Sequence, residues 1–402
     1  MSASILAAVE MAPRDPILGM SELFNADPNP RKVNLGIGVY TNDAGKVPLL
    51  ECVRRSDAAI LADPAPWNYL PIDGLAAYDK AVQRLVFGAE SAVIKEGRGV
   101  TVQALGGTGA LKIGADFLSR HNPGAAVWIS DPSWENHRAL FEGDGFTVQS
   151  YPYYDAAAHG VNFAAMTAAL EKAPTGTIIV LHACCHNPTG YDLTPEQWTR
   201  VIEIVKAREL VPFLDIAYQG FAESVEADGE AVRRFAAAMS PVFVSSSFSK
   251  SFSLYGERVG ALSVATASTE EAARVLSQLK RVVRINYSNP PTHGSKVVAN
   301  VLTTPELHSL WDRELGQMRD RIKTMRTALV DGIQARVPGF DFSFVLRQRG
   351  MFSYSGLSKA QVQRLREEFA IYTIETGRIC VAALNAGNIE YSVDAIARVL
   401  KS

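Results

Sequence analysis

The sequence predicts an α/β protein with a mostly parallel, helix-covered sheet in a large domain and a smaller α/β domain beside it. Two observations indicate this fold class. From about residue 95 to 265, short apolar runs alternate with helical patterns, as in βαβ units. After residue 303, apolar residues recur at helical spacing up to about residue 337. We therefore expect a large domain at 46–304 and a small domain built from 1–45 and 305–402.

Four apolar runs in the large domain are expected to be buried strands, because each is too short and too evenly apolar for an exposed helix. They are Ala125–Ser130, Thr177–Leu181, Val211–Leu214 and Val242–Val244. Ligands of such sheets bind at the carboxyl ends of the strands. Polar or aromatic residues follow each run within a few positions, namely Trp134, Asn187, Asp215 and Lys250. A site at that edge of the sheet is therefore expected.

The small domain is expected to begin with one long helix over about 305–337. Thr304 can cap this helix and Pro305 suits its first turn. A strand-like segment from Phe340 to Leu346 and a charged helix from Ser358 to Phe369 follow. The first ~45 residues hold too little apolar sequence for a core of their own, so they are expected to pack with this part.

Composition excludes several classes of protein. A net charge of −2 and a pI near 6.4 give no electrostatic footprint for nucleic acid. No run of about 18 apolar residues predicts a membrane span. The N-terminal segment lacks the basic region of a signal peptide, and four scattered cysteines suit a reducing compartment. We expect a cytoplasmic protein.

Lys250 is the first candidate catalytic residue. It follows a hydroxyl-rich loop, Ser245–Ser249, and precedes a second cation, Arg258. An amine here could form a Schiff base, and the hydroxyls and guanidinium could hold a phosphate, which together suit pyridoxal phosphate. The alternative is a solvated lysine in a serine-rich surface turn.

A glycine-rich segment, Gly106-Gly107-Thr108-Gly109, opens a helical pattern. Its backbone N–H groups and the positive end of the helix could bind a phosphate. The dinucleotide fingerprint needs Gly or Ala where Lys112 stands, and the Gly-Lys-Ser/Thr of the nucleotide P-loop is absent. A phosphate site and a structural turn remain as the two interpretations.

Asp215 ends an apolar strand, where an ionised carboxylate needs a facing cation. A protonated pyridine nitrogen would be such a cation and would keep the ring an electron sink. Alternatively, Asp215 caps the next helix or pairs with a structural arginine. Tyr218 and Asn187 could hydrogen-bond the cofactor's phenolic oxygen, or could be a core tyrosine and a turn residue.

A cluster of histidines and cysteines weakly suggests a metal site. It consists of His182, Cys184, Cys185 and His186. In extended backbone, neighbouring side chains face opposite sides, and the pair spacing typical of zinc sites is absent, so packing is expected and no metal is predicted. His137 is expected on a helix surface or in the core, with a possible supporting role near Trp134.

Four motifs occur in order along the chain. They are Asn187-Pro188-Thr189-Gly190, Asp215-Ile216-Ala217-Tyr218-Gln219-Gly220-Phe221, Ser247-Phe248-Ser249-Lys250 and Arg258-Val259-Gly260. Together they resemble the aspartate and aromatic amino-acid aminotransferases, a fold-type I family that depends on pyridoxal 5'-phosphate. The resemblance runs from residue 15 to the C-terminus.

The resemblance implies a role for each matching residue. Lys250 would form the Schiff base with the cofactor and carry the proton between the substrate Cα and the cofactor. Asp215 would hold the pyridinium nitrogen. The other implied cofactor contacts are Tyr218 and Asn187 at the phenolic oxygen, Trp134 stacked on the ring, and Gly107, Thr108, Ser247 and Arg258 at the phosphate, joined by Tyr69 of a neighbouring subunit.

For the substrate, the resemblance implies that Arg378 binds the α-carboxylate with Gly38, Trp134 and Asn187 nearby. Arg284, from the neighbouring subunit, would meet a distal carboxylate, since two guanidinium groups suit a dicarboxylic acid. The family forms homodimers whose active sites span the interface. The partners are then amino acids and 2-oxo acids, without nucleic acid or membrane.

The residues that bear on substrate choice resemble two different branches of the family. Residues 134–137, 207–216 and 253–258 look most like the bacterial tyrosine (aromatic) branch, whereas Val39, Asn68, Thr108 and Asn289 look like the aspartate branch. We expect an aromatic-amino-acid aminotransferase that uses 2-oxoglutarate, also acts on aspartate and works by a ping-pong mechanism through pyridoxamine phosphate. The alternative is a dedicated aspartate aminotransferase. Arg284 could swing out to admit an aromatic ring.

Two further classes of protein are alternatives to an aminotransferase. A cofactor-binding transcriptional regulator would need an added DNA-binding domain, for which the chain has no room. A lyase or decarboxylase on the same scaffold need not bind a second carboxylate, so the dependence of dicarboxylate kinetics on Arg284 separates it from an aminotransferase.

Overall fold

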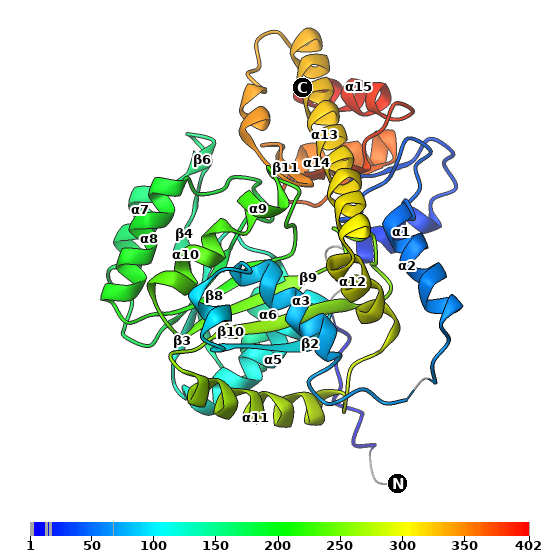
Figure 1. Cartoon of the computed structure of the whole chain (residues 1–402). Helices are drawn as coiled ribbons and strands as arrows, with labels where there is room; N and C mark the ends of the chain where they lie inside the picture. The colour runs from blue at the N-terminus through cyan, green and yellow to red at the C-terminus, as the bar shows by residue number, and fades with distance from the viewer. Residues whose placement is uncertain (1–3, 13–14, 16–17, 67, 402) are drawn as a thin grey trace.

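A computed structural model describes residues 4–12, 15, 18–66 and 68–401, and its centre is a seven-stranded sheet (Figure 1). In spatial order the strands are β2 (Gly99–Leu105), β10 (Val259–Ala265), β9 (Val242–Ser247), β8 (Val211–Ile216), β7 (Ile178–His182), β3 (Ala126–Asp131) and β4 (Thr147–Pro152). Strand β10 runs antiparallel to both of its neighbours, and the other pairs are parallel. The expected mostly parallel α/β sheet is confirmed.

Helices cover both faces of this sheet. One face packs against α5 (Gly106–His121), α6 (Glu135–Gly143) and α11 (Thr269–Asn286), and the other against α3 (Ala76–Phe87), α7 (Phe163–Leu170), α8 (Pro195–Ala207), α10 (Glu230–Ala238) and α12 (His293–Thr303). Successive residues of β7 alternate between the two cores: Ile178 and Val180 enter one, Ile179 and Leu181 the other. Each such fully buried side chain contributes about 1.5–3 kcal/mol. Because both faces are covered, strand sequences read as continuous apolar runs.

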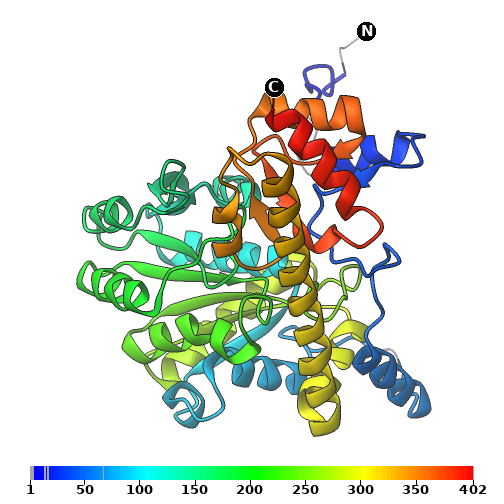
Figure 2. The ribbon, with the colours of Figure 1, turned by 90° about the horizontal axis from the view of Figure 1, so that it is seen from above.

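A long helix, α13 (Pro305–Arg336), runs from the sheet region toward the C-terminal elements (Figure 2). It confirms the helix expected from periodicity and starts at Pro305. Thr304 is the N-cap residue, as expected, but its side chain makes no capping hydrogen bond and its hydroxyl donates to Asn300 Oδ1 at 3.2 Å. The charged helix is α14 (Lys359–Phe369), and Ser358 and Gln361 form a capping box at its start.

The strand expected over Phe340–Leu346 is wrong. A 3₁₀ helix, η1 (Ser343–Arg347), occupies most of that segment. The backbone bonds locally, with the Val345 N–H donating to the Phe342 carbonyl at 3.2 Å. Phe342 and Phe344 are both buried with ring centroids 5.4 Å apart, so burial of aromatic side chains had produced a strand-like pattern without strand pairing.

Two pairs of short strands lie outside the central sheet in the terminal parts of the chain, and the first pair joins the N-terminal part to the C-terminal part. Strand β1 (Val33–Asn34) pairs with β12 (Ile371–Tyr372), and β11 (Phe352–Tyr354) pairs with β13 (Arg378–Cys380). The remaining elements are α1 (Leu18–Ala26), α2 (Glu51–Ala62), α4 (Ala92–Lys95), α9 (Val225–Asp228), α15 (Ile389–Leu400), β5 (Tyr154–Asp155), β6 (Gly160–Val161) and η2 (Val381–Ala383). Within the described ranges, none of the helices has the length and hydrophobicity that crossing a bilayer requires. The domain boundaries at 45/46 and 304/305 stay a prediction.

Candidate active site

A cavity of about 350 Å³ opens beside the carboxyl ends of β7, β8 and β9. Predicted site residues from distant parts of the chain line it together: Gly38, Gly107, Thr108, Trp134, Asn187, Asp215, Tyr218, Ser247, Lys250, Arg258 and Arg378. The sheet explains this convergence, because parallel strands end at the same edge and their following loops meet there. The position of the cavity agrees with the site expected at that edge.

Lys250 lies just past the end of β9. The serines before it were expected in a loop, but β9 continues through Ser247, which pairs with Gly260 of β10. Burial lowers the pKa of the Lys250 amine to about 8; the Asp215 carboxylate opposes this shift, while Arg258 and Arg378 add to it. A solvated surface lysine is therefore excluded, and near pH 8 much of this amine is neutral and nucleophilic.

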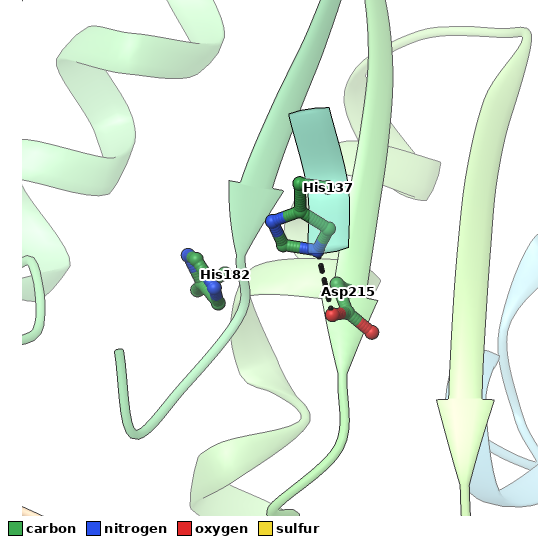
Figure 3. Close-up of side chains that lie close together, drawn as sticks. All are labelled: His137, His182 and Asp215. Atoms are coloured by element: carbon green, nitrogen blue, oxygen red, sulfur yellow. Dashed lines mark hydrogen bonds and ion pairs between the residues drawn. The ribbon is translucent and has the colours of Figure 1, made fainter. Parts of the chain in front are cut away.

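Asp215 lies inside β8 and is held by a histidine, as Figure 3 shows. Its Oδ2 is 3.1 Å from His137 Nε2, and His137 Nδ1 is 2.9 Å from Ser133 Oγ. Burial raises the pKa of Asp215, but the hydrogen bond and charge of His137, with a smaller effect of Lys250, bring it below its usual value. Neither helix capping nor a structural arginine explains this carboxylate.

The other oxygen of Asp215 is free to meet a ligand. Oδ1 is buried and has no hydrogen-bond partner among the residues that the structure describes. His182, close by in Figure 3, has its pKa lowered to about 3 by burial and by His137, so it is neutral and brings no competing charge. A buried ionised carboxylate with one unpartnered oxygen is suited to a cationic N–H donor.

The N-terminus of α5 and Arg258 form the opposite end of the cavity. Gly106 has φ +68°, and a Cβ there would lie 2.5 Å from Arg258 Nη2, so glycine allows the guanidinium to approach the helix. Arg258 Nη1 donates to Ser249 Oγ at 3.3 Å and to the Tyr255 carbonyl at 3.0 Å. Helix dipole, hydroxyls and guanidinium together suit the binding of an anion such as a phosphate.

Arg378, in β13, is a buried cation that lines the cavity. It is 2% exposed, donates to Asn187 Oδ1 at 3.0 Å and to the Gly36 carbonyl at 2.7 Å, and lies 4.1 Å from the Phe352 ring centroid. Its partners are neutral, and burial lowers its pKa. A carboxylate ligand would therefore gain a desolvated, pre-oriented guanidinium.

Two predicted residues lie outside this cavity. Tyr69 is 91% exposed, and Arg284 is exposed near the end of α11, where it donates to Ser288 Oγ. Neither lines the cavity of its own chain.

Comparison with known proteins identifies the family. The family model described as "Aminotransferase class I and II" matches residues 30–396. The chain belongs to this family. The aspartate aminotransferase of Pseudomonas aeruginosa is 62% identical over 99% of this chain and 100% of the relative. The aromatic-amino-acid aminotransferase of Escherichia coli is 53% identical over 96% of this chain and 98% of the relative.

A solved structure extends the comparison to three dimensions. An aromatic-amino-acid aminotransferase from Burkholderia pseudomallei, described as covalently bound to pyridoxal phosphate, is 66% identical, with a TM-score of 0.96 over 99% of this chain and 100% of that one. The aminotransferase family inferred from the four motifs is thus confirmed, and so is the fold.

The aminotransferase cavity contains residues that sequence reasoning missed. Ile37, Tyr255 and Phe352 line it. The sequence could have predicted Tyr255 as a cavity residue, since it lies between Lys250 and Arg258. Its hydroxyl accepts the Tyr40 N–H at 2.9 Å and so ties this loop to the 37–40 segment. Phe352 carried no local signal, because only packing across the chain places its ring against Arg378.

The interpretation of Cys184 and Cys185 was also incomplete. Cys185 has φ +50° rather than extended backbone, so the two sulfurs and a carboxylate oxygen of Asp228 all lie within 4.8 Å of one another. Burial raises the pKa of the Cys185 thiol to about 11, and Asp228 already accepts backbone N–H groups of Gly220, Ala222 and Glu223. Asp228 therefore fixes the backbone of the 220–223 loop.

Proposed function

We propose that this protein is an aromatic-amino-acid aminotransferase that uses 2-oxoglutarate as amino acceptor and also accepts aspartate. The observation that carries the proposal is the distribution of charge in the cavity. Arg378 is the buried cation at the substrate end, and the walls near it include Ile37, Val39 and Phe352. Such walls suit an aromatic ring, whereas a distal carboxylate needs the exposed Arg284 of a second subunit.

The cofactor is pyridoxal phosphate, and the cavity fits it. Asp215 Oδ1 is available for the pyridinium N–H, the α5 N-terminus and Arg258 for the phosphate, and Lys250 for the carbonyl carbon. When bound, the cofactor supplies an electrophilic carbonyl and an electron-accepting ring that stabilises negative charge at the substrate Cα. We assign Trp134 to the ring face and Tyr218 and Asn187 to the phenolic oxygen.

The residues of this chain then orient the substrate and move its proton. Arg378 grips the α-carboxylate and so fixes the Cα beside Lys250. Lys250 Nζ takes the Cα proton, which requires the neutral amine favoured by its lowered pKa of about 8. Asp215 stays ionised because His137 donates to it. The amino group of the amino acid stays with the enzyme-bound cofactor, and the remaining 2-oxo acid is released before 2-oxoglutarate binds. This order of events is a ping-pong mechanism.

We further propose a homodimer in which Tyr69 and Arg284 of each subunit complete the other's site. Their exposure and their absence from their own cavity support this arrangement. The four cysteines are buried and free, which supports the proposed cytoplasmic location.

Single half-reactions test the substrate assignment. Holoenzyme is mixed with tyrosine, phenylalanine, aspartate or leucine, and the absorbance of the bound cofactor is followed in a stopped-flow instrument. We expect the two aromatic amino acids and aspartate to react, and leucine to react much more slowly. A reaction with aspartate but not with saturating tyrosine or phenylalanine would contradict the aromatic assignment.

A dedicated aspartate aminotransferase is the second candidate. It is favoured by the name of the Pseudomonas aeruginosa relative and by Val39 and Thr108, which line the cavity and match the aspartate branch. Arg284→Ala adds a second test. We expect kcat/KM for aspartate to fall at least roughly 100-fold, through loss of a charge-assisted bidentate contact, with little change for phenylalanine. Unchanged dicarboxylate kinetics would favour a lyase or decarboxylase.

A further inference from the structure

A second cavity, separate from the active site, has four basic side chains and one acidic side chain in its lining. Its volume is about 410 Å³, and it lies between α13 and the segment 346–350. Its charged lining residues are Lys323, Arg326, Arg347, Arg349 and Glu223. It shares no lining residue with the active-site cavity. Four cations facing one carboxylate create a positive potential inside this cavity.

Arg326 is the buried member of this group, at 4% exposure. Its Nε donates to Ser353 Oγ at 3.2 Å, and its Nη2 donates to the carbonyls of Gly350 at 2.6 Å and Phe352 at 3.3 Å. These acceptors are neutral. Among the described residues, no carboxylate forms an ion pair with Arg326, and its Nη1 makes no hydrogen bond. Burial lowers the pKa of Arg326 to about 10, which leaves it charged at neutral pH.

Glu223 balances only the outer part of the cluster. It pairs with Arg349 and, at 3.5 Å, with Lys323, and all three side chains are about half exposed. Arg347 donates to the His159 carbonyl at 2.9 Å and has no acid partner in the described part of the chain. One rim carboxylate therefore leaves the guanidinium of Arg326 uncompensated, and a buried cation without an anion is costly.

We propose that this cavity binds a small oxyanion with at least two negative charges, held by Arg326 with Lys323 and Arg349 at the rim. A planar guanidinium binds the oxygens of phosphate groups and of carboxylates in pairs, so a phosphate compound or a polycarboxylate fits this chemistry. The volume lies in the range of small-molecule sites. The site is independent of the proposed amino-acid substrate.

The location of this oxyanion site connects it to the active site. Arg326 binds the carbonyl of Phe352, and the Phe352 ring lies against Arg378 in the substrate cavity. A ligand on Arg326 therefore lies next to the segment that forms one wall of that cavity.

Calorimetric titration of the holoenzyme tests the proposal, with inorganic phosphate and citrate as separate probes. Because both anions can also meet Arg378, each titration is repeated with Arg378→Met, in which binding to the oxyanion site should persist. In that background we expect Lys323→Glu to weaken binding at least roughly tenfold and Glu223→Gln, which removes the competing carboxylate, to tighten it about threefold.

Arg313→Glu is the matched control, because it reverses an exposed charge on the same helix outside the cavity. It should change affinity less than about twofold. Lys323 is half exposed, so its variant is expected to fold even if Arg326 variants do not. Binding of phosphate alone or of citrate alone supports the site and identifies the ligand class. If neither anion binds to Arg378→Met, or if Lys323→Glu and Arg313→Glu weaken binding equally, the proposal is wrong.

A crystallographic measurement locates the anion. Holoenzyme crystals soaked in tungstate should show an anomalous peak beside Arg326, and this peak should be absent in Lys323→Glu. A peak only at Arg378 or Arg258 would overturn the assignment to this cavity.

Discussion

Lys250 becomes reactive through burial, which outweighs the carboxylate beside it. Removal from water disfavours the ammonium form, whereas Asp215 favours it, and the result is a pKa of about 8 instead of the usual lysine value. Arg258 and Arg378, which we propose bind the two ends of the ligand, lower this pKa further. The two proposed anion-binding cations therefore also favour the neutral form of the proposed nucleophile.

The first prediction concerns pH. Cofactor uptake by the apoprotein requires neutral Lys250, so its rate should rise roughly tenfold per pH unit below pH about 8 and level off above it. The rate rises with pH because the neutral form of Lys250 accumulates as the pH rises through its lowered pKa. Stopped-flow absorbance during reconstitution measures the rate. A midpoint above pH about 10, as for a solvated lysine, would contradict the assignment.

At the scale of elements, the start of α5 and the strand-end loops must meet within a few ångströms. Gly106 makes this possible, because its positive φ and missing Cβ leave room for Arg258. Gly107 is similarly tight, since a Cβ there would lie 3.2 Å from the Ser247 Cβ. The glycines of this segment thus provide close approach as well as free N–H groups.

The second prediction separates the role of Gly106 in cofactor binding from its effect on backbone stability. Gly106→Ala should raise the cofactor dissociation constant at least roughly tenfold, because the new methyl displaces the Arg258 guanidinium, and should also destabilise the backbone by about 1–2 kcal/mol. Equilibrium binding and thermal unfolding measure the two effects. Gly124→Ala is the matched control: it has φ +80° with no atom within 4 Å of the added Cβ, so it should lose stability only. Equal cofactor affinity in both variants would refute the role of Gly106.

At the scale of the whole molecule, one chain holds an incomplete version of the proposed site. The cavity contains the groups for cofactor and α-carboxylate, while Tyr69 and Arg284 face outward. In the proposed homodimer, this exposed tyrosine and arginine would become functional only at the site of a second copy.

The third prediction tests this sharing by complementation. Lys250→Ala and Arg284→Asp are each expected to have little activity toward aspartate. After subunit exchange, a mixed dimer contains one site with both native residues, so roughly a quarter of the wild-type activity should return. Initial rates before and after mixing, with each variant mixed with itself as control, give the result. Full exchange without recovery would show that Arg284 acts within its own subunit or not at all.

Local patterns predicted much of the fold. The β7, β8 and β9 runs, α13 and α14 were visible because a strand covered on both faces is evenly apolar and a packed helix repeats its apolar face every 3.6 residues. The Phe340–Leu346 segment shows where this reasoning fails, since alternating buried aromatics without a partner strand curled into η1. Local patterns also failed at Cys185. Its backbone is left-handed, and no neighbouring residue in the sequence predicts that conformation.

The sequence by itself determined the chemistry of this aminotransferase: a lysine, a strand-end aspartate, a glycine-rich helix start and two arginines, in the order typical of the family. Only the tertiary structure decided the rest. It placed His137 on Asp215, Phe352 on Arg378, and Arg326 in a cationic cavity where no carboxylate of the described residues pairs with it. The physical reason is that residue types and spacing set which bonds can form, whereas burial and long-range packing set which partners meet and how strongly their charges act.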